Sequence, residues 1–278
     1  MRDELEALAA DLRAVLEDAT TRGAWGEDPE APLPEAIAPE PVEAAAPASE
    51  GAAPDRAPAD LPPVQATAWA ALATSARQSA EERITHGAEG LTRLREELGD
   101  CRRCGLCRGR RHIVFGVGAP EADLVIVGEA PGFHEDAQGE PFVGEAGKML
   151  DKMLENVLGL RREQVYICNV VKCRPPDNRD PEPPEVEACL PFLRRQIQAI
   201  EPKVLLVLGR VALQNLFGDP RAGIKRNRGT WREYEGIPVL PTFHPAYLLR
   251  QPQDKRLVFE DLKALRVRYD ALGGGREG

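Results

Sequence analysis

The sequence has no apolar run long enough to span a bilayer and shows no secretory signal. We therefore expect a cytosolic, cytoplasmic protein with no membrane partner. Thiols stay reduced in that compartment, so the six cysteines are not expected to form a disulfide framework. The 278 residues, 42% of them hydrophobic, allow one core of ordinary size with an appendage.

Two common nucleotide-binding motifs are also missing. No G-x-G-x-x-G fingerprint of a dinucleotide-binding fold is present. Gly147-Lys148 does not belong to a Walker A loop, because Phe142 stands at the upstream glycine position and Met149 replaces the Ser or Thr. These two ways of holding a nucleotide are therefore excluded.

The charge is unevenly distributed. Residues 1–90 hold 18 Asp and Glu against 6 Arg, whereas residues 91–278 hold 27 Asp and Glu against 30 Lys and Arg. The acidity therefore lies in the N-terminal third. The remaining two thirds are mildly basic, which is compatible with a phosphate-backbone partner.

The N-terminal third is not expected to form part of the core. Residues 1–22 have apolar residues at helical spacing and predict an amphipathic helix. Residues 23–66 are rich in Pro, Ala and Glu, which predicts a disordered linker. Residues 67–94 are expected to form a helical connector. Whether this arm binds a protein partner stays open.

Residues 95–272 alternate between apolar runs and helical patterns, which predicts one α/β domain with a mostly parallel sheet covered on both faces. The strands are expected at 124–127, 165–171, 204–208 and 237–241, and the helices near 145–158, 184–200, 209–217 and 255–271. Prolines in the last strand predict that it lies at a sheet edge.

Polar residues follow three of these strands. The tight turn 128–132 follows the first strand, Asn169 stands near the end of the second, and His244 follows the fourth. Asn169 or His244 alone would be unremarkable. Ligands bind at the carboxyl ends of the strands in such sheets, and the fold brings these ends together. The sequence therefore predicts a binding site at this edge.

Four cysteines form two pairs. Cys101 and Cys104 make a C-x2-C pair, and Cys173 and Cys189 make a C-x15-C pair about seventy residues later. Four thiolates from two distant segments suit zinc or an iron–sulfur cluster. Cys107 extends the first pair to a ferredoxin-like C-x2-C-x2-C spacing.

Several long motifs resemble the family 4 (iron–sulfur) uracil-DNA glycosylases over roughly 95–270. The stretches that carry the resemblance are 128–144, 166–179 and 244–250, together with Phe115-Gly116 and 228–231. The resemblance implies a three-layer α/β/α sandwich around a four-stranded sheet. It also implies a monomeric DNA repair enzyme that hydrolyses uracil from single- or double-stranded DNA and leaves an abasic site.

The resemblance implies roles in gripping a flipped uracil. Phe142 would stack on the base, Asn169 would read its Watson–Crick edge, and His244 would donate toward uracil O2 as the bond breaks. Leu248 and its neighbours Tyr247 and Leu249 would wedge into the duplex.

The turn after the first strand would line the same pocket. The resemblance implies that backbone groups of Gly128, Glu129 and Ala130 would face the base. It also implies that Glu129 would orient water or stabilise the sugar cation. Ala130 stands where better-known uracil glycosylases have a water-activating Asp, so general-base catalysis from that position is unavailable. Glu135 is a candidate for lining the edge that excludes thymine.

The resemblance assigns four cysteines to a [4Fe–4S] cluster that braces the fold and performs no redox step. These ligands are Cys101, Cys104, Cys173 and Cys189. Cys107 is interpreted as a bystander and Cys168 as a core residue. Zinc at the same thiolates remains an alternative. So do two functions: a non-catalytic DNA- or nucleotide-binding module, and a glycosylase acting on other deaminated bases.

Overall fold

The structure is a computed structural model that describes residues 85–275. The predicted helix at 1–22, the predicted linker at 23–66 and most of the connector at 67–94 lie outside the described residues. The first described helix, α3 (Gly87–Leu98), ends before Gly99, whose φ of 48° suits glycine at a helix C-terminus. It leads directly to the first cysteine pair.

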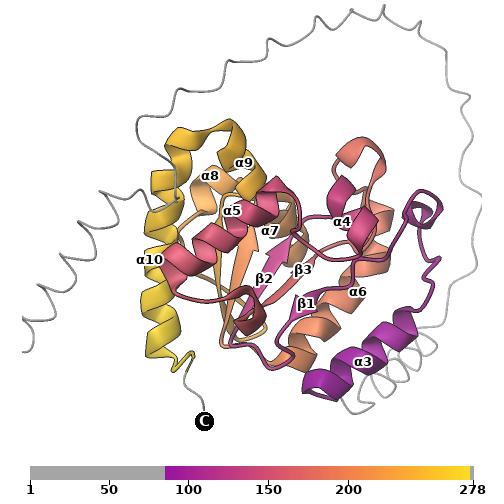
Figure 1. The fold of residues 1–278 in the computed structure, drawn as a ribbon, viewed down its shortest axis with the longest axis horizontal. Helices are drawn as coiled ribbons and strands as arrows, with labels where there is room; N and C mark the ends of the chain where they lie inside the picture. Colours follow the sequence, from indigo (N-terminus) through magenta and orange to yellow (C-terminus); the bar gives the residue numbers. More distant parts are fainter. Residues whose placement is uncertain (1–84, 276–278) are drawn as a thin grey trace, which may run out of the picture. The chain divides into compact units, whose positions relative to one another are not determined.

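The core of the fold is a six-stranded sheet with strand order β1-β3-β2-β4-β6-β5 (Figure 1). Its strands are β1 (Val117–Gly118), β2 (Leu124–Gly128), β3 (Tyr166–Asn169), β4 (Val204–Leu208), β5 (Arg232–Tyr234) and β6 (Ile237–Thr242). The four inner strands are parallel, so the predicted four-stranded parallel sheet is confirmed. The short strands β1 and β5 add one antiparallel partner at each edge.

The prediction that 237–241 forms a sheet edge was wrong, because β5 pairs with β6. The two strands join through Glu235 and Gly236, both at positive φ, as in a two-residue hairpin turn. Pro238 stands opposite Glu233 in this hairpin, and Pro241 lies beyond the end of β5. The prolines are therefore tolerated in a strand with neighbours on both sides.

Helices cover both faces of the sheet. The long ones are α5 (Glu145–Met153), α6 (Pro183–Ile200), α7 (Arg210–Phe217) and α10 (Lys255–Ala271), close to the four predicted helices. The short ones are α4 (Phe133–Gln138), α8 (Ile224–Asn227) and α9 (Pro245–Arg250), and a π-helical turn (Leu154–Leu158) extends α5. No helix among residues 85–275 has the length and apolar content to cross a membrane.

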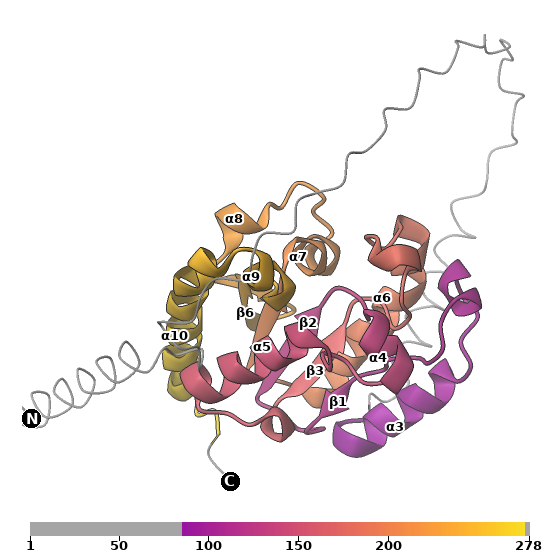
Figure 2. The same ribbon diagram turned by 45° about the horizontal axis from the view of Figure 1, so that its top comes forward.

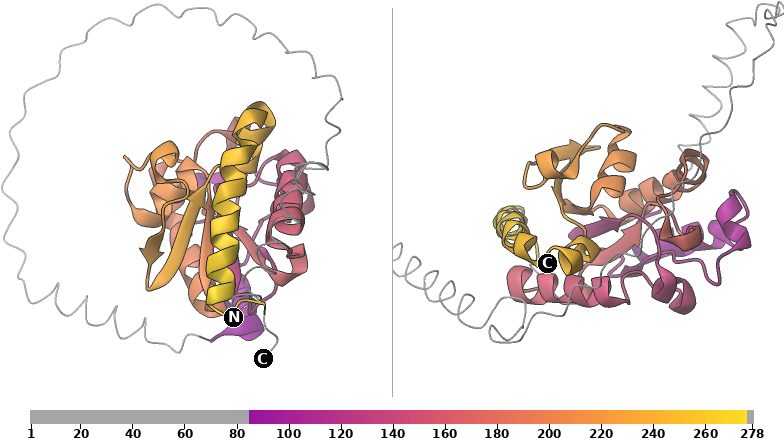
Figure 3. Two further views of the ribbon diagram at one scale, coloured as in Figure 1. Left: turned by 90° about the vertical axis from the view of Figure 1, so that its left-hand side faces the viewer. Right: turned by 90° about the horizontal axis from the view of Figure 1, so that it is seen from above.

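Successive strand residues face opposite layers of the core. Val125 and Val127 of β2 pack with residues of α3, α6 and α7, whereas Leu124 and Ile126 pack with residues of α5, α9 and α10. Both layers are visible from the side in Figure 3. Because each face is covered, β2 and β4 are apolar throughout, as their uninterrupted hydrophobic runs indicated.

The carboxyl ends of β3, β2, β4 and β6 lie in this order along one edge of the sheet. Gly128 pairs with Asn169 in register. Beyond this pair the chains stay joined, because Val170 N–H donates to the Gly128 carbonyl at 3.0 Å and Val171 N–H to the Glu129 carbonyl at 3.2 Å. The Gly209 N–H, after β4, donates to the Thr242 carbonyl at 2.9 Å. These bonds hold the loops after the strands around one space.

Candidate active site

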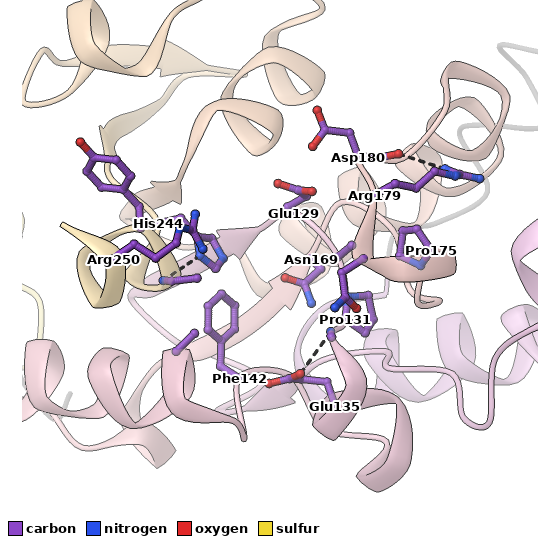
Figure 4. A pocket seen from close by; sticks show the side chains of 16 residues that line it. Glu129, Pro131, Glu135, Phe142, Asn169, Pro175, Arg179, Asp180, His244 and Arg250 are labelled. Atoms are coloured by element: carbon purple, nitrogen blue, oxygen red, sulfur yellow. Dashed lines mark hydrogen bonds between the residues drawn. The ribbon is translucent and has the colours of Figure 1, made fainter. Parts of the chain in front are cut away.

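A pocket of about 440 Å³ opens at this edge of the sheet, a size typical of small-molecule sites. Its lining comes from the loops after β2, β3 and β6: Glu129, Ala130, Pro131, Gly132, Glu135, Phe142, Ala146, Asn169, Pro175, Asn178, Arg179, Asp180, His244, Ala246, Tyr247 and Arg250. Figure 4 shows Phe142, Asn169 and His244 pointing toward a common space, with Glu129 nearby. The structure thus brings together the residues that the sequence placed at three strand ends.

Gly128, predicted to contact the base, is not among the lining residues, and there is no room for a side chain at its position. A Cβ there would stand 2.3 Å from Asn169 Oδ1 and 2.7 Å from Phe142 Cζ. Both distances are far below van der Waals contact. Glycine therefore lets the amide of Asn169 and the ring of Phe142 approach the backbone of β2.

Asn169 presents an unsatisfied acceptor. The residue is 1% exposed, and its Oδ1 is buried without a hydrogen-bond partner among the described residues. A buried polar atom without a partner is costly, at roughly 1–3 kcal/mol. Such an atom at the floor of a pocket indicates that a ligand supplies the missing donor.

Phe142 is held in an unusual backbone conformation. Its φ is +55°, a region that bulky residues rarely adopt, and its side chain is 6% exposed. The Phe142 and His244 rings are stacked with centroids 5.4 Å apart and an interplanar angle of 29°. That spacing leaves no room for a base between the two rings, so a stacked ligand must use another part of the Phe142 surface.

The Glu135 carboxylate joins the turn after β2 to the loop that carries the Phe142 ring. One carboxylate oxygen accepts from Gly132 N–H at 3.1 Å, and the other accepts from Val143 and Gly144 N–H, both at 3.0 Å. The side chain lines the pocket, as predicted for a substrate contact, but both of its oxygens are engaged by backbone groups. Its visible role is to fix the position of Phe142 relative to the turn after β2.

His244 is held as a neutral hydrogen-bond donor. It caps α9, and its Nδ1 accepts from Ala246 N–H at 3.1 Å. Burial, and then the positive charge of Arg250, lower the pKa of His244 to about 4. In the neutral ring an accepting Nδ1 leaves the proton on Nε2. The contact with Ala246 therefore selects the tautomer that can donate through Nε2.

Glu129 has the opposite shift. Burial, and then the carboxylate of Asp180, raise the pKa of Glu129 to about 7, while Arg210 lowers it. Arg210 pairs with Asp180 at 2.5 Å. Glu129 therefore changes its charge near neutral pH, in the range where an acid–base or electrostatic role is most sensitive to conditions.

The predicted wedge is only partly supported by the structure. Leu248 is completely buried in the core, so it cannot insert between base pairs, and that prediction was wrong. Tyr247 donates its hydroxyl to Asp254 at 2.5 Å. Leu249 is 44% exposed, which leaves it as the apolar side chain of this helix available to DNA.

The four paired cysteines line one small cavity between α3, α6 and the loop after β3. The cavity is lined by Leu98, Cys101, Arg103, Cys104, Arg110, Ile113, Lys172, Cys173, Ala188 and Cys189. Cys107 and Cys168 are not among them. Within residues 85–275 no three His, Cys, Asp or Glu side chains stand close enough to hold a single metal ion.

Several N–H groups point at these sulfur atoms. Arg110 Nη1 is 3.4 Å from Cys173 Sγ, Arg103 Nη1 is 3.3 Å from Cys101 Sγ, and Lys172 N–H donates to Cys189 Sγ at 3.3 Å. Burial raises the pKa of the Cys173 thiol to about 11, whereas the contact with Arg110 lowers it. The three N–H contacts are of the kind that stabilises negatively charged sulfur.

Lys172 connects the cysteine cavity to the pocket. The side chain is 1% exposed, and its Nζ donates to the backbone carbonyl of Asn169 at 2.7 Å. Sequence reasoning missed this role, as it missed the pair of Asp180 and Arg210. A Lys between two apolar residues and a cysteine gives no sign of burial, and the partners of Asp180 appear only in the folded chain.

Comparisons with known proteins agree with this geometry. A model of the uracil DNA glycosylase superfamily matches residues 115–263. The type-4 uracil-DNA glycosylase of Sulfurisphaera tokodaii is 45% identical over 185 residues, covering 64% of this chain and 84% of its own length. That of Archaeoglobus fulgidus is 47% identical over 184 residues, covering 64% and 92%. A type-5 uracil-DNA glycosylase of Thermus thermophilus is 33% identical over 140 residues, covering 45% and 63%.

Replacing Glu135 by Ala removes the acceptor for three backbone N–H groups. We expect the free energy of unfolding to fall by about 1–3 kcal/mol, because these donors lose a charged partner. The matched control is Glu140→Ala, which removes an exposed carboxylate just after α4 and should change stability by less than about 0.5 kcal/mol. Urea denaturation measures both, and equal losses would contradict the proposed bracing by Glu135.

Proposed function

The chain belongs to the uracil DNA glycosylase superfamily and, within it, to the type-4 enzymes, and from this premise we propose that it removes uracil from DNA. The reaction hydrolyses the glycosidic bond and leaves an abasic site, a step of DNA repair. The observation that carries the proposal is the buried, unpartnered Oδ1 of Asn169 on the pocket floor. The Phe142 ring and the neutral donor His244 line the same pocket.

The pocket chemistry favours a uracil that has left the base stack, since the glycosidic bond is unreachable inside a duplex. Asn169 Oδ1 would accept from uracil N3–H, and its amide NH2 would donate to O4. Cytosine reverses both groups, so both hydrogen bonds would become conflicts. Sites with such dedicated polar contacts discriminate by roughly 10⁴-fold. The Phe142 ring would stack on the base for about 1–3 kcal/mol.

Bond breaking places positive charge on the sugar and negative charge on the departing uracil. His244 Nε2–H would donate toward O2, where the negative charge collects, without giving up its proton. The Glu129 carboxylate would face the sugar cation and orient the attacking water. Ala130 offers no acid at the next position. In this mechanism positioning and electrostatic stabilisation would account for most of the reduction of the activation barrier.

We further propose that Cys101, Cys104, Cys173 and Cys189 hold a [4Fe–4S] cluster. In such a cluster each thiolate binds a different iron atom, so its four sulfurs stand farther apart than around one ion. This agrees with a shared cavity in which no single-ion site is formed. When bound, the cluster supplies a brace between the segment before β1 and the loop after β3, and glycosidic hydrolysis requires no electron from it.

The activity is tested with a labelled oligonucleotide that carries one uracil. Incubation should make the oligonucleotide alkali-labile. His244→Ala and Asn169→Ala should each lower kcat by about 10²- to 10³-fold, because the first removes a donor to the developing negative charge and the second removes the hydrogen bonds to the base edge. His86→Ala, an exposed histidine of the same chain, is the control. Tight binding without cleavage of single- or double-stranded substrate would favour the non-catalytic module, and cleavage of other deaminated bases instead of uracil would favour the shifted specificity.

The pH dependence follows from the raised pKa of Glu129. Because the carboxylate is the active form, log kcat/KM should rise with a slope near one below pH 7 and level off above it. Glu129→Gln should remove this rise and lower the plateau. His244, with its pKa near 4, stays neutral across this range and adds no second limb. A flat wild-type profile from pH 5 to 9 would contradict the assignment.

The cofactor is tested by metal analysis of the purified protein. We expect a brown protein with broad absorption near about 400 nm and about four iron atoms per chain. Cys173→Ser should lose iron and colour, whereas Cys107→Ser, outside the cavity, should keep both. A colourless protein with one zinc ion per chain would show that the four thiolates serve a different metal.

A further inference from the structure

An exposed aromatic ring, that of Phe133, stands beside the pocket and contacts the ring of His134 edge-on. Phe133 is 50% exposed and is the first residue of α4, directly after the pocket residue Gly132. Burying this side chain would be favourable by roughly 1.5–3 kcal/mol. Its exposed ring is instead in contact with two basic side chains.

Two arginines from separate segments pack against this ring. The guanidinium carbon of Arg111 lies 5.5 Å from the ring centroid of Phe133, and that of Arg174 lies 5.3 Å from it. Arg111 follows the first cysteine segment, whereas Arg174 follows Cys173 after β3. Figures 1 and 2 both place α4 beside the loop that precedes α6, where these segments meet. We call Arg111, Phe133 and Arg174 the arginine clamp.

The backbone and side-chain contacts around the clamp fix its geometry. Arg174 Nε donates to Asn178 Oδ1 at 2.8 Å, and Asn178 itself lines the pocket. The backbone N–H of Arg111 donates at 2.8 Å to the buried carboxylate of Asp136 in α4. Both arginines are thus tied to elements that border the pocket.

The positive charges of the clamp lack protein counter-charges. Within residues 85–275 no carboxylate lies within ion-pair distance of either guanidinium, whereas Arg110 and Arg179 of the same two segments have such partners. A guanidinium presents a planar fork of donors that matches phosphate oxygens. Two such forks held by one ring form a preorganised site for a polyanion.

We propose that the arginine clamp binds the phosphodiester backbone of the DNA strand beside the flipped nucleotide, with Phe133 as the residue that positions both guanidinium groups. This proposal rests on the proposed function, because it takes the pocket as the place of the flipped base. Each guanidinium neutralises one phosphate. Phe133 keeps the two charges at the rim, so little side-chain entropy is lost when the strand docks.

The test measures binding without turnover. The probe is an oligonucleotide whose single uracil is carried on a 2′-fluoro sugar, since the fluorine disfavours the sugar cation and slows cleavage. Fluorescence anisotropy gives the Kd at several salt concentrations. Arg111→Ala and Arg174→Ala should each reduce the slope of log Kd against log salt by about 0.7 on single-stranded and about 0.9 on duplex DNA, which corresponds to one phosphate contact.

Two further variants separate the clamp from general charge effects. Arg268→Ala removes an equal charge from an exposed position in the last turn of α10 and should leave the slope unchanged. Phe133→Leu keeps both arginines and the net charge, yet should reduce the slope because the guanidinium groups lose their support. Arg174→Lys, which keeps the charge but not the fork, should weaken binding with a smaller change in slope.

The outcomes distinguish the clamp from the proposed function. Slopes that stay at the wild-type value in both arginine variants would overturn the clamp even in a protein that excises uracil. A Phe133→Leu slope equal to wild type would overturn the positioning role of the ring. Reduced slopes in a protein that excises no uracil would support the phosphate site and count only against the proposed reaction. Unchanged iron content in Arg174→Ala excludes an indirect effect through Cys173.

Discussion

The pairing of β2 with β3 at their carboxyl ends is the contact on which the site depends. It sets Gly128 opposite Asn169, and the missing side chain of Gly128 lets the amide and the Phe142 ring reach the strand backbone. Two further hydrogen bonds, from Val170 and Val171 to the turn after β2, continue the pairing past the end of the sheet. The pocket floor is thus made of backbone that the hydrogen-bond ladder has already fixed, which lowers the cost of ordering it when a ligand binds.

The same short segment serves two sites. Residues 169–173 run from the unpartnered amide of Asn169 to a cysteine of the second pair, and Lys172 lies between them, fully buried. Its Nζ donates to the carbonyl of Asn169, and its backbone N–H donates to Cys189 Sγ. A buried ammonium is costly unless negative groups surround it. Thiolates in the adjacent cavity would provide that charge, so the state of the cysteines and the placement of Asn169 are physically coupled.

The sequence was informative where the fold rules are strong. Largely apolar runs predicted the four inner strands, the fourth from a weaker run that contains prolines, and the rule for parallel sheets then placed Glu129, Asn169 and His244 at one edge. The sequence was less informative where contacts between residues far apart in the chain determine the structure. The strands β1 and β5 are too short to show a pattern, and the pairing of β5 with Pro238 reversed the expected edge. The motif alone did not show that Leu248 is buried rather than exposed. The clamp around Phe133 joins three segments whose proximity no local spacing encodes.

Burial acts on Glu129 and His244 in a consistent direction. It raises the pKa of Glu129 to about 7 and lowers that of His244 to about 4, so in each case the neutral form is favoured. The surroundings of these two side chains therefore disfavour charge. Electrostatic interactions are strong in such surroundings, because few water dipoles screen them. When a glycosidic bond opens and creates a cation and an anion, dipoles already aimed at those positions stabilise them without reorganising. In the proposed mechanism the amide of Asn169 and the Nε2–H of His244 would be such dipoles, which would let a site with no acid at position 130 lower the barrier.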